Sequence, residues 1–90
     1  MVASSDSIRI DQLLWRLRFV KTRGLAQKAI QSSHIRINGR RVLRSSAAIR
    51  ADDVLTMPWS SSVIALRISH IPHRRGPAKE AQDCYELLDE

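Results

Sequence analysis

The spacing of the apolar residues changes abruptly at residues 32–34, and this change constrains the fold more than any other feature of the chain. Before it, apolar side chains recur every three or four residues, which is the period of an amphipathic helix. After it, apolar and polar residues alternate, as in a strand with one buried face. The dipeptide Asn38-Gly39 then supplies the two positive φ angles of a type I′ hairpin turn. The pattern predicts helices followed by a β-hairpin, which indicates an α+β fold.

Two short helices are expected before residue 32. The first has apolar residues at i, i+3, i+4 and i+7 from Ile10, and Asp11 is a candidate for its N-cap. The second begins after Thr22, which is a second N-cap candidate, and a tight connection at residues 19–22 joins the two. The residues expected to face the core are Ile10, Leu13, Leu14, Leu17, Leu25, Ala26, Ala29 and Ile30.

The hairpin turn also predicts a strand register. With two residues in the turn, Ile37 lies opposite Arg40 and Arg36 lies opposite Arg41. Like charges that face each other across two strands are unfavourable. A local conflict of this kind is typical of a binding site, because a bound anion between the two guanidinium groups would remove it.

The rest of the chain is expected to complete the sheet and to end in a helix. Strands are expected at residues 54–57 and 62–68, with a turn region at 58–61, and Ile49 is expected to anchor the loop before them. Pro77 is well placed to open a helix over residues 78–88. The expected architecture is two N-terminal helices packed on a small, mainly antiparallel sheet, with a short C-terminal helix. Its expected parts are a disordered leader (1–7), a main domain (8–71), and a C-terminal loop and helix packed on it (72–90).

Positive charge is concentrated in the first half of the chain. Residues 1–50 hold eleven Lys or Arg and two acidic residues, whereas residues 51–90 hold four Lys or Arg and seven acidic residues. Such an excess of one charge repels itself until an anion neutralises it. Phosphate is the favoured anion, because each neutralised phosphate of a nucleic acid also releases a condensed counterion. The charge pattern therefore indicates a nucleic-acid partner.

Other features of the composition bear on location. Cys84 is the only cysteine, so it forms no internal disulfide, which fits a reducing compartment. No apolar run approaches the length of about 20 residues that crosses a bilayer. We expect a cytoplasmic protein with no membrane association.

The residues with reactive or metal-ligating side chains do not form a catalytic or metal-binding pattern. His70 and His73 flank a proline with no further ligand at metal spacing, so they are expected to be surface histidines, and Cys84 is expected in the core. The sequence has no paired carboxylates in an apolar setting, no Ser-His or Cys-His set and no Gly-rich phosphate loop. We expect no metal, no cofactor and no enzyme activity.

Two segments, taken in order, resemble the S4 RNA-binding domain, a family also called the alpha-L motif. They are the run from Arg9 to Arg23 with its Lys-Thr-Arg junction, and the hairpin run Ile35-Arg-Ile-Asn-Gly39. A later stretch, Arg-Arg-Gly-Pro-Ala at 74–78 followed by Glu-Ala and Tyr-Glu, resembles one subfamily, the bacterial fifteen-kilodalton heat-shock protein. Each motif is common alone, but the ordered set is specific and covers roughly residues 8–86. The resemblance implies an S4-like fold for residues 8–71.

The resemblance also implies a binding surface for RNA. In the family, RNA is held by the exposed side of the helix pair and by the hairpin beside it. Independently, the free amides at Thr22, Arg23 and Gly24 favour an anion at a helix N-terminus, and Arg23 adds a planar fork suited to phosphate. The candidate RNA-binding residues are Arg9, Arg16, Arg18, Lys21, Thr22, Arg23, Gln27, Lys28, Arg36, Asn38, Arg40 and Arg41.

The subfamily resemblance implies a more specific partner. It implies binding to RNA of the large ribosomal subunit, and a part in recycling stalled subunits that carry a nascent chain. We expect a monomer. The subfamily carries a long basic C-terminal extension, whereas this chain ends on Asp89-Glu90.

Two other function classes remain open. The helix, short turn and helix also resemble a DNA-binding helix-turn-helix, although no dimerisation surface is evident in the sequence. The other class is an enzyme, for instance a fragment related to RNA-modifying proteins that carry this domain as an appendage, although the sequence offers no catalytic pattern for it. Trp15 either stacks on an RNA base or packs under the C-terminal segment, and we favour packing.

Overall fold

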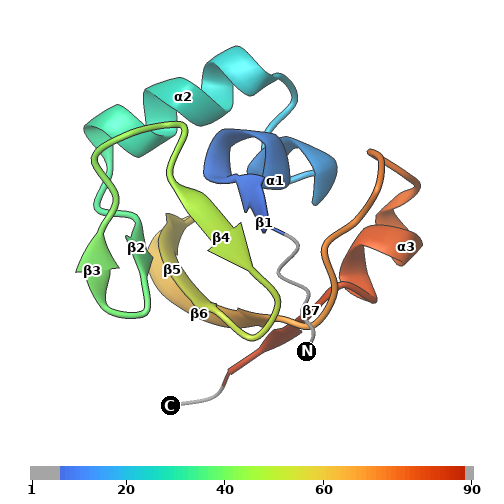
Figure 1. The fold of residues 1–90 in the computed structure, drawn as a ribbon. Helices are drawn as coiled ribbons and strands as arrows, with labels where there is room; N and C mark the ends of the chain where they lie inside the picture. Colours follow the sequence, from blue (N-terminus) through green and yellow to red (C-terminus); the bar gives the residue numbers. More distant parts are fainter. Residues whose placement is uncertain (1–6, 89–90) are drawn as a thin grey trace.

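The α+β class is confirmed in a computed structural model of the chain, which describes residues 7–88. The expected leader lies mostly outside the described residues, but Ser7 belongs to a strand. The elements, in chain order, are β1 (Ser7–Arg9), α1 (Ile10–Arg16), α2 (Arg23–Ser32), β2 (Arg36–Ile37), β3 (Arg40–Arg41), β4 (Ala48–Arg50), β5 (Val54–Trp59), β6 (Ser62–Ile68), α3 (Ala78–Gln82) and β7 (Tyr85–Leu87). Helices α1 and α2 lie over a curved sheet, with the β2–β3 hairpin at one side and α3 at the other (Figure 1).

The core is built from the helix faces that the apolar spacing indicates. The stripe that begins at Ile10 is buried along α1, and it packs against strand residues such as Leu55 and Leu66. On α2, Ala26 and Ile30 are buried, as expected. Leu25 is 46% exposed, so its assignment to the core was wrong. It lies in the first turn of α2, where the helix has just left the tight connection and its flank still faces solvent.

Of the two helix N-caps expected from the sequence, one is confirmed. Thr22 caps α2, because its Oγ1 accepts a hydrogen bond of 3.1 Å from the amide of Leu25. Asp11 does not cap α1, and that prediction was wrong. Strand β1 runs directly into the helix, so the N-cap position falls on Arg9. The amides of Ile10 and Asp11 instead donate to the carbonyls of Ala47 (2.9 Å) and Ser45 (3.2 Å), which leaves the Asp11 carboxylate free for other partners.

The strands form two antiparallel sheets. One pairs β1 with β4, and the other has the order β3-β2-β5-β6-β7. The hairpin register is confirmed, with Arg36 opposite Arg41 and Ile37 opposite Arg40. Its turn has positive φ at both Asn38 (52°) and Gly39 (84°), as a type I′ turn requires.

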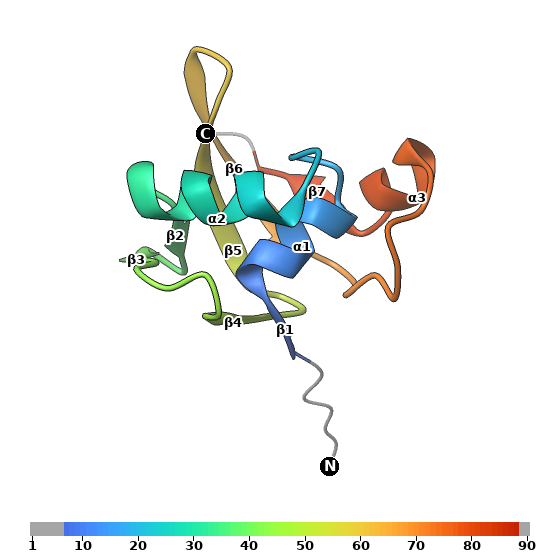
Figure 2. The ribbon, with the colours of Figure 1, turned by 90° about the horizontal axis from the view of Figure 1, so that it is seen from above.

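The second half of the chain corrects two expectations. Strand β5 continues through Pro58 and Trp59, so the turn region at 58–61 shrinks to Ser60-Ser61, and the β5–β6 hairpin projects beyond the helices (Figure 2). Helix α3 begins at Ala78 as expected but ends at Gln82, and the residues from Tyr85 onward form β7 instead of continuing the helix. The free edge of β6 accounts for this, because pairing Tyr85 with Ile68 satisfies backbone groups on both strands. Within residues 7–88, no helix has the length and apolar character needed to cross a membrane.

Candidate nucleic-acid interface

Asp11 organises the surface where α1 meets α2. Its carboxylate is fully buried and accepts two hydrogen bonds from Arg9, of 3.1 and 3.0 Å, and one of 3.0 Å from Gln27. The guanidinium of Arg23 lies 3.6 Å from the same carboxylate, while the side chains of Arg9 and Arg23 remain 48% and 43% exposed. One buried acid thus holds three of the candidate RNA-binding side chains together, with donor groups still facing solvent. We call Arg9, Asp11, Arg23 and Gln27 the Asp11 surface.

The charge state of Asp11 follows from these contacts. Burial raises the pKa of Asp11, but the hydrogen bonds from Gln27 and Arg9 and the positive charge of Arg9 outweigh it, so the pKa lies below its ordinary value. The carboxylate is therefore ionised at neutral pH, and it neutralises only one of the two adjacent guanidinium groups. The Asp11 surface keeps a net positive charge, which suits a phosphate ligand.

The start of α2 extends this surface. Lys21 and Thr22 are exposed in the connection before the helix, and Lys28 is exposed one turn beyond Gly24. The amide of Leu25 is used by the Thr22 cap, whereas within residues 7–88 the amides of Arg23 and Gly24 engage in no hydrogen bond. Two amides at the N-terminus of a ten-residue helix therefore point outward beside the Asp11 surface.

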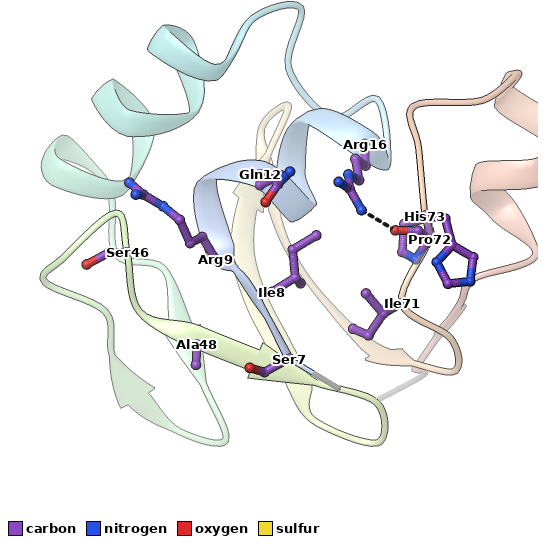
Figure 3. Close-up of a pocket in the computed structure, with 10 residues that line it drawn as sticks. All are labelled: Ser7, Ile8, Arg9, Gln12, Arg16, Ser46, Ala48, Ile71, Pro72 and His73. Carbon is purple, nitrogen blue, oxygen red and sulfur yellow. Dashed lines mark hydrogen bonds between the residues drawn. The ribbon is translucent and has the colours of Figure 1, made fainter. Parts of the chain in front are cut away.

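Arg16 and Arg18 are engaged elsewhere. Arg16 donates a hydrogen bond of 2.6 Å to the carbonyl of Pro72, which Figure 3 shows crossing from α1 to the facing loop. Arg18 donates one of 2.9 Å to the carbonyl of Gly76. In the opposite direction, Arg75 donates one of 2.9 Å to the carbonyl of Trp15. These guanidinium–carbonyl bonds, which we call the 72–76 contact, hold the C-terminal segment against the end of α1.

The same contact settles where Trp15 lies. The guanidinium carbon of Arg75 stands 5.5 Å from the centre of the Trp15 ring, within the range of a cation–π interaction. The favoured alternative, packing under the C-terminal segment, is confirmed. Beside it, Arg16, Arg9, Gln12 and His73 line a shallow cavity of about 670 Å³ (Figure 3).

In the hairpin, the candidate residues divide between structural and exposed roles. The Asn38 side chain joins the turn to β5, because its Nδ2 donates to Asp53 (3.0 Å) and its Oδ1 accepts from the amide of Val54 (2.9 Å). Arg36 and Arg41 are exposed and face each other across the strands, as expected. The conflict between their like charges is therefore present in the folded protein.

A cleft between the hairpin and β4 brings together arginines that the sequence did not group. Arg40 and Arg41 line it from the hairpin, and Arg44 and Arg50 line it from the following segment. The cleft has a volume of about 930 Å³, and we call it the hairpin cleft. Arg44 and Arg50 were missed because the segment at 43–53 has no periodicity that assigns its side chains to a face. Only the excess of basic residues before position 51 pointed to them.

The residues that most resemble catalytic or metal-binding groups are not poised for such roles. Burial raises the pKa of the Cys84 thiol, and the nearby charges of Asp83 and Glu80 raise it further. Within residues 7–88, no group of three or more His, Cys, Asp or Glu side chains is placed to hold a metal ion. The chemistry that the described surface offers is positive charge and hydrogen-bond donation.

Sequence comparisons relate the chain to known proteins. The model of the S4 domain family matches residues 8–55. Heat shock protein 15 of Escherichia coli (strain K12) is 33% identical over 79 residues, which are 88% of this chain and 59% of that protein. Small ribosomal subunit protein uS4 of Bradyrhizobium diazoefficiens is 35% identical over 71 residues, or 77% of this chain and 35% of that protein.

A solved structure has a similar fold. The trimeric structure of Vibrio cholerae Heat Shock Protein 15 superposes with a TM-score of 0.84 at 29% identity, covering 92% of this chain and 83% of that one. The chain spans about 59% of the length of the Escherichia coli relative.

Proposed function

Because the chain belongs to the S4 domain family, we propose that it is a non-catalytic RNA-binding protein that recognises structured RNA. The Asp11 surface is the observation that carries this proposal. There a buried carboxylate orients Arg9, Arg23 and Gln27, and two free helix amides lie beside them. Such an arrangement presents fixed donors to phosphate oxygens, and it recognises RNA by shape and backbone more than by base sequence.

The proposed RNA is ribosomal RNA of the large subunit. The proposal includes a cytoplasmic protein that takes part in recycling stalled subunits carrying a nascent chain. It is supported by the likeness to Heat shock protein 15, while the likeness to small ribosomal subunit protein uS4 makes the small subunit the natural comparison. Sedimentation of the protein with separated subunits tests it. Binding to the large subunit is the expected result, and equal binding to both subunits would contradict it.

Binding measurements with purified ribosomal RNA test the broader proposal. If about five or six basic residues contact phosphate, the logarithm of the association constant should fall with the logarithm of the salt concentration at a slope of roughly −4 to −5. Competition with duplex DNA at equal salt distinguishes RNA binding from the helix-turn-helix alternative. A slope near zero, or a preference for the DNA, would remove the proposal.

Arg23→Ala addresses the Asp11 surface directly. It should weaken RNA binding with little change in the melting temperature, because Arg23 is 43% exposed and its 3.6 Å ion pair duplicates the bonds from Arg9. Arg67→Ala is a matched control, since Arg67 pairs with Glu86 on the sheet formed by β6 and β7. Loss of folding in Arg23→Ala would show that this arginine is structural.

The oligomeric state belongs to the same proposal. We propose a monomer, whereas the solved Vibrio cholerae structure is described as trimeric. Light scattering of the protein with and without ribosomal RNA decides between the two.

A further inference from the structure

The hairpin cleft lies between two unpaired strand edges. Within residues 7–88, strand β3 is the end strand of the five-stranded sheet, and β4 pairs with β1 alone in the other sheet. The gap between them is therefore bordered by backbone from both sheets. Its volume is about 930 Å³, and it is open to solvent.

Among the described residues, the positive charge in the cleft has no partner. Within residues 7–88, the guanidinium groups of Arg40, Arg41, Arg44 and Arg50 form neither hydrogen bonds nor ion pairs, and all four residues are exposed. Asp53 is the one acid among the lining residues. Four guanidinium groups in a concave site repel one another, and the field they create attracts a polyanion.

The Asp53 carboxylate is already used to hold the walls of the cleft. Its Oδ1 accepts from Nδ2 of Asn38 at 3.0 Å, and its Oδ2 accepts from the amide of Arg50 at 2.8 Å. It therefore ties the hairpin turn to the end of β4. A site whose walls are fixed before binding loses less conformational entropy when a ligand enters.

The remaining wall is tied to the Asp11 surface. The turn that follows Arg44 accepts hydrogen bonds at Ser45 and Ala47 from the amides of Asp11 and Ile10. The same Asp11 holds Arg9 and Arg23 through its carboxylate. The two basic surfaces are thus linked by hydrogen bonds through the first turn of α1.

The ligand chemistry follows from the lining. None of the lining residues is aromatic, so the cleft offers no stacking platform for a base. Four arginines distributed along an open cleft match a chain of repeated phosphates better than one small anion, because each guanidinium can engage its own phosphate.

We propose that the hairpin cleft binds a second segment of RNA backbone, so that the bound RNA passes around both sides of the β2–β3 hairpin. This inference rests on the RNA binding proposed above. It makes Arg44 and Arg50, outside the candidate surface expected from the sequence, direct phosphate contacts.

The double variant Arg44→Ser/Arg50→Ser tests the proposal, with purified large-subunit ribosomal RNA as the probe. Loss of two phosphate contacts should reduce the magnitude of the salt slope, which is the slope of the logarithm of the association constant against the logarithm of the salt concentration, by roughly 1.5. It should also weaken binding about tenfold at about 0.1 M salt. Arg44→Lys/Arg50→Lys should keep most of the slope because it keeps the charge. The matched control Arg67→Ser/Arg74→Ser removes two arginines that pair with Glu86 and Glu80, and it should leave the slope unchanged.

The outcomes separate this inference from the proposed function. If the wild-type protein binds the RNA and the Arg44→Ser/Arg50→Ser protein binds it with the same affinity and slope, the cleft is not a binding site and the proposed function stands. If the wild-type protein does not bind RNA, both proposals fail. An equal loss in the Arg67→Ser/Arg74→Ser control would show that only total charge matters, which also overturns the cleft.

A tethered probe tests the path of the RNA without removing an arginine. An iron–EDTA group on Leu43→Cys, in a Cys84→Ser background, sits at a cleft residue that is 73% exposed. It should cleave bound ribosomal RNA at a discrete position, whereas the same group on Gln82→Cys of α3, on the other side of the molecule from the hairpin (Figure 1), should not cleave there. Absence of cleavage from Leu43→Cys under conditions where the RNA is bound would overturn the proposed path.

Discussion

Arginine has opposite roles in the 72–76 contact and in the hairpin cleft. In the 72–76 contact, Arg16, Arg18 and Arg75 donate to backbone carbonyls that lie 56 to 60 residues away in the sequence. In the cleft, Arg40 and Arg44 find no such partner within residues 7–88. The first set stabilises the fold, and the second set is the one that we propose to bind a ligand.

The difference between the two regions comes from the acceptors that surround each arginine. Near the end of α1 the carbonyl of Trp15 accepts a hydrogen bond from Arg75, and residues 72–76 bring the carbonyls of Pro72 and Gly76 beside the helix. In the cleft, the one acidic side chain is already used, since the Asp53 carboxylate accepts hydrogen bonds from Asn38 and from the amide of Arg50. An arginine is therefore left without an internal partner where the fold has already satisfied the nearest carboxylate, and these are the arginines that we propose to bind RNA.

The largest effect is expected from Leu14→Ala, which removes part of the hydrophobic core. Leu14 is fully buried, so the free energy of unfolding should fall by about 2–5 kcal/mol. Denaturant unfolding measures this change. Under conditions where the variant is still folded, its affinity for ribosomal RNA should match that of the wild-type protein. A drop in RNA affinity without a loss of stability would show that Leu14 contributes to binding and not to the stability of the core.

Arg75→Ala breaks the 72–76 contact. It removes the hydrogen bond to Trp15 and the cation–π contact, so we expect the free energy of unfolding to fall by about 1.5–3 kcal/mol. RNA affinity should stay near that of the wild-type protein. Arg74→Ala is the neighbouring control, because Arg74 only pairs with Glu80 at the surface. If Arg75→Ala weakened RNA binding and left stability intact, the two regions would not differ as proposed.

Arg36→Ala/Arg41→Ala should have the converse effect. RNA affinity should fall about tenfold, equivalent to about 1.4 kcal/mol, because two exposed guanidinium groups on the hairpin are lost. Stability should be unchanged or slightly higher, since the two like charges no longer face each other. Anisotropy titration and a thermal melt of the same sample measure both quantities. Unchanged affinity would show that the hairpin does not touch RNA.

The smallest effect concerns pH and the Asp11 surface. The pKa of Asp11 is lower in the folded protein than its ordinary value, so the ionised carboxylate contributes stability that is present above that value and is lost as the pH falls through the lower, folded one. The free energy of unfolding should therefore decline less steeply below about pH 4 in Asp11→Asn than in the wild-type protein. Identical slopes would show that the ionised form of Asp11 adds nothing to the fold.

Much of the fold could be predicted because it depends on neighbours in the sequence. Asn38-Gly39 determines the turn and hence the register of the hairpin, and Thr22 caps the helix that it precedes. The S4-like fold indicated by the resemblance is confirmed by the family match and by the solved structure.

The failures involve partners that are remote in the sequence. The apolar spacing of Ala81, Cys84 and Tyr85 fits a helix, but the free edge of β6 recruits Tyr85 into β7. Asp11 has the position of a helix cap, yet β1 extends the chain into α1 and turns that carboxylate toward Arg9 and Gln27. The local sequence pattern predicts neither the pairing of Tyr85 with β6 nor the hydrogen bond between Asp11 and Gln27.

The sequence by itself determined the helix and hairpin pattern, the facing pair Arg36 and Arg41, and the excess of positive charge in the first half of the chain. Only the tertiary structure decided which arginines hold the fold together and which remain open to a ligand. The physical reason is that a guanidinium group is paired or free according to the acceptors within about 3 Å of it. For Arg16, Arg18 and Arg44, those surroundings are set by how distant segments pack.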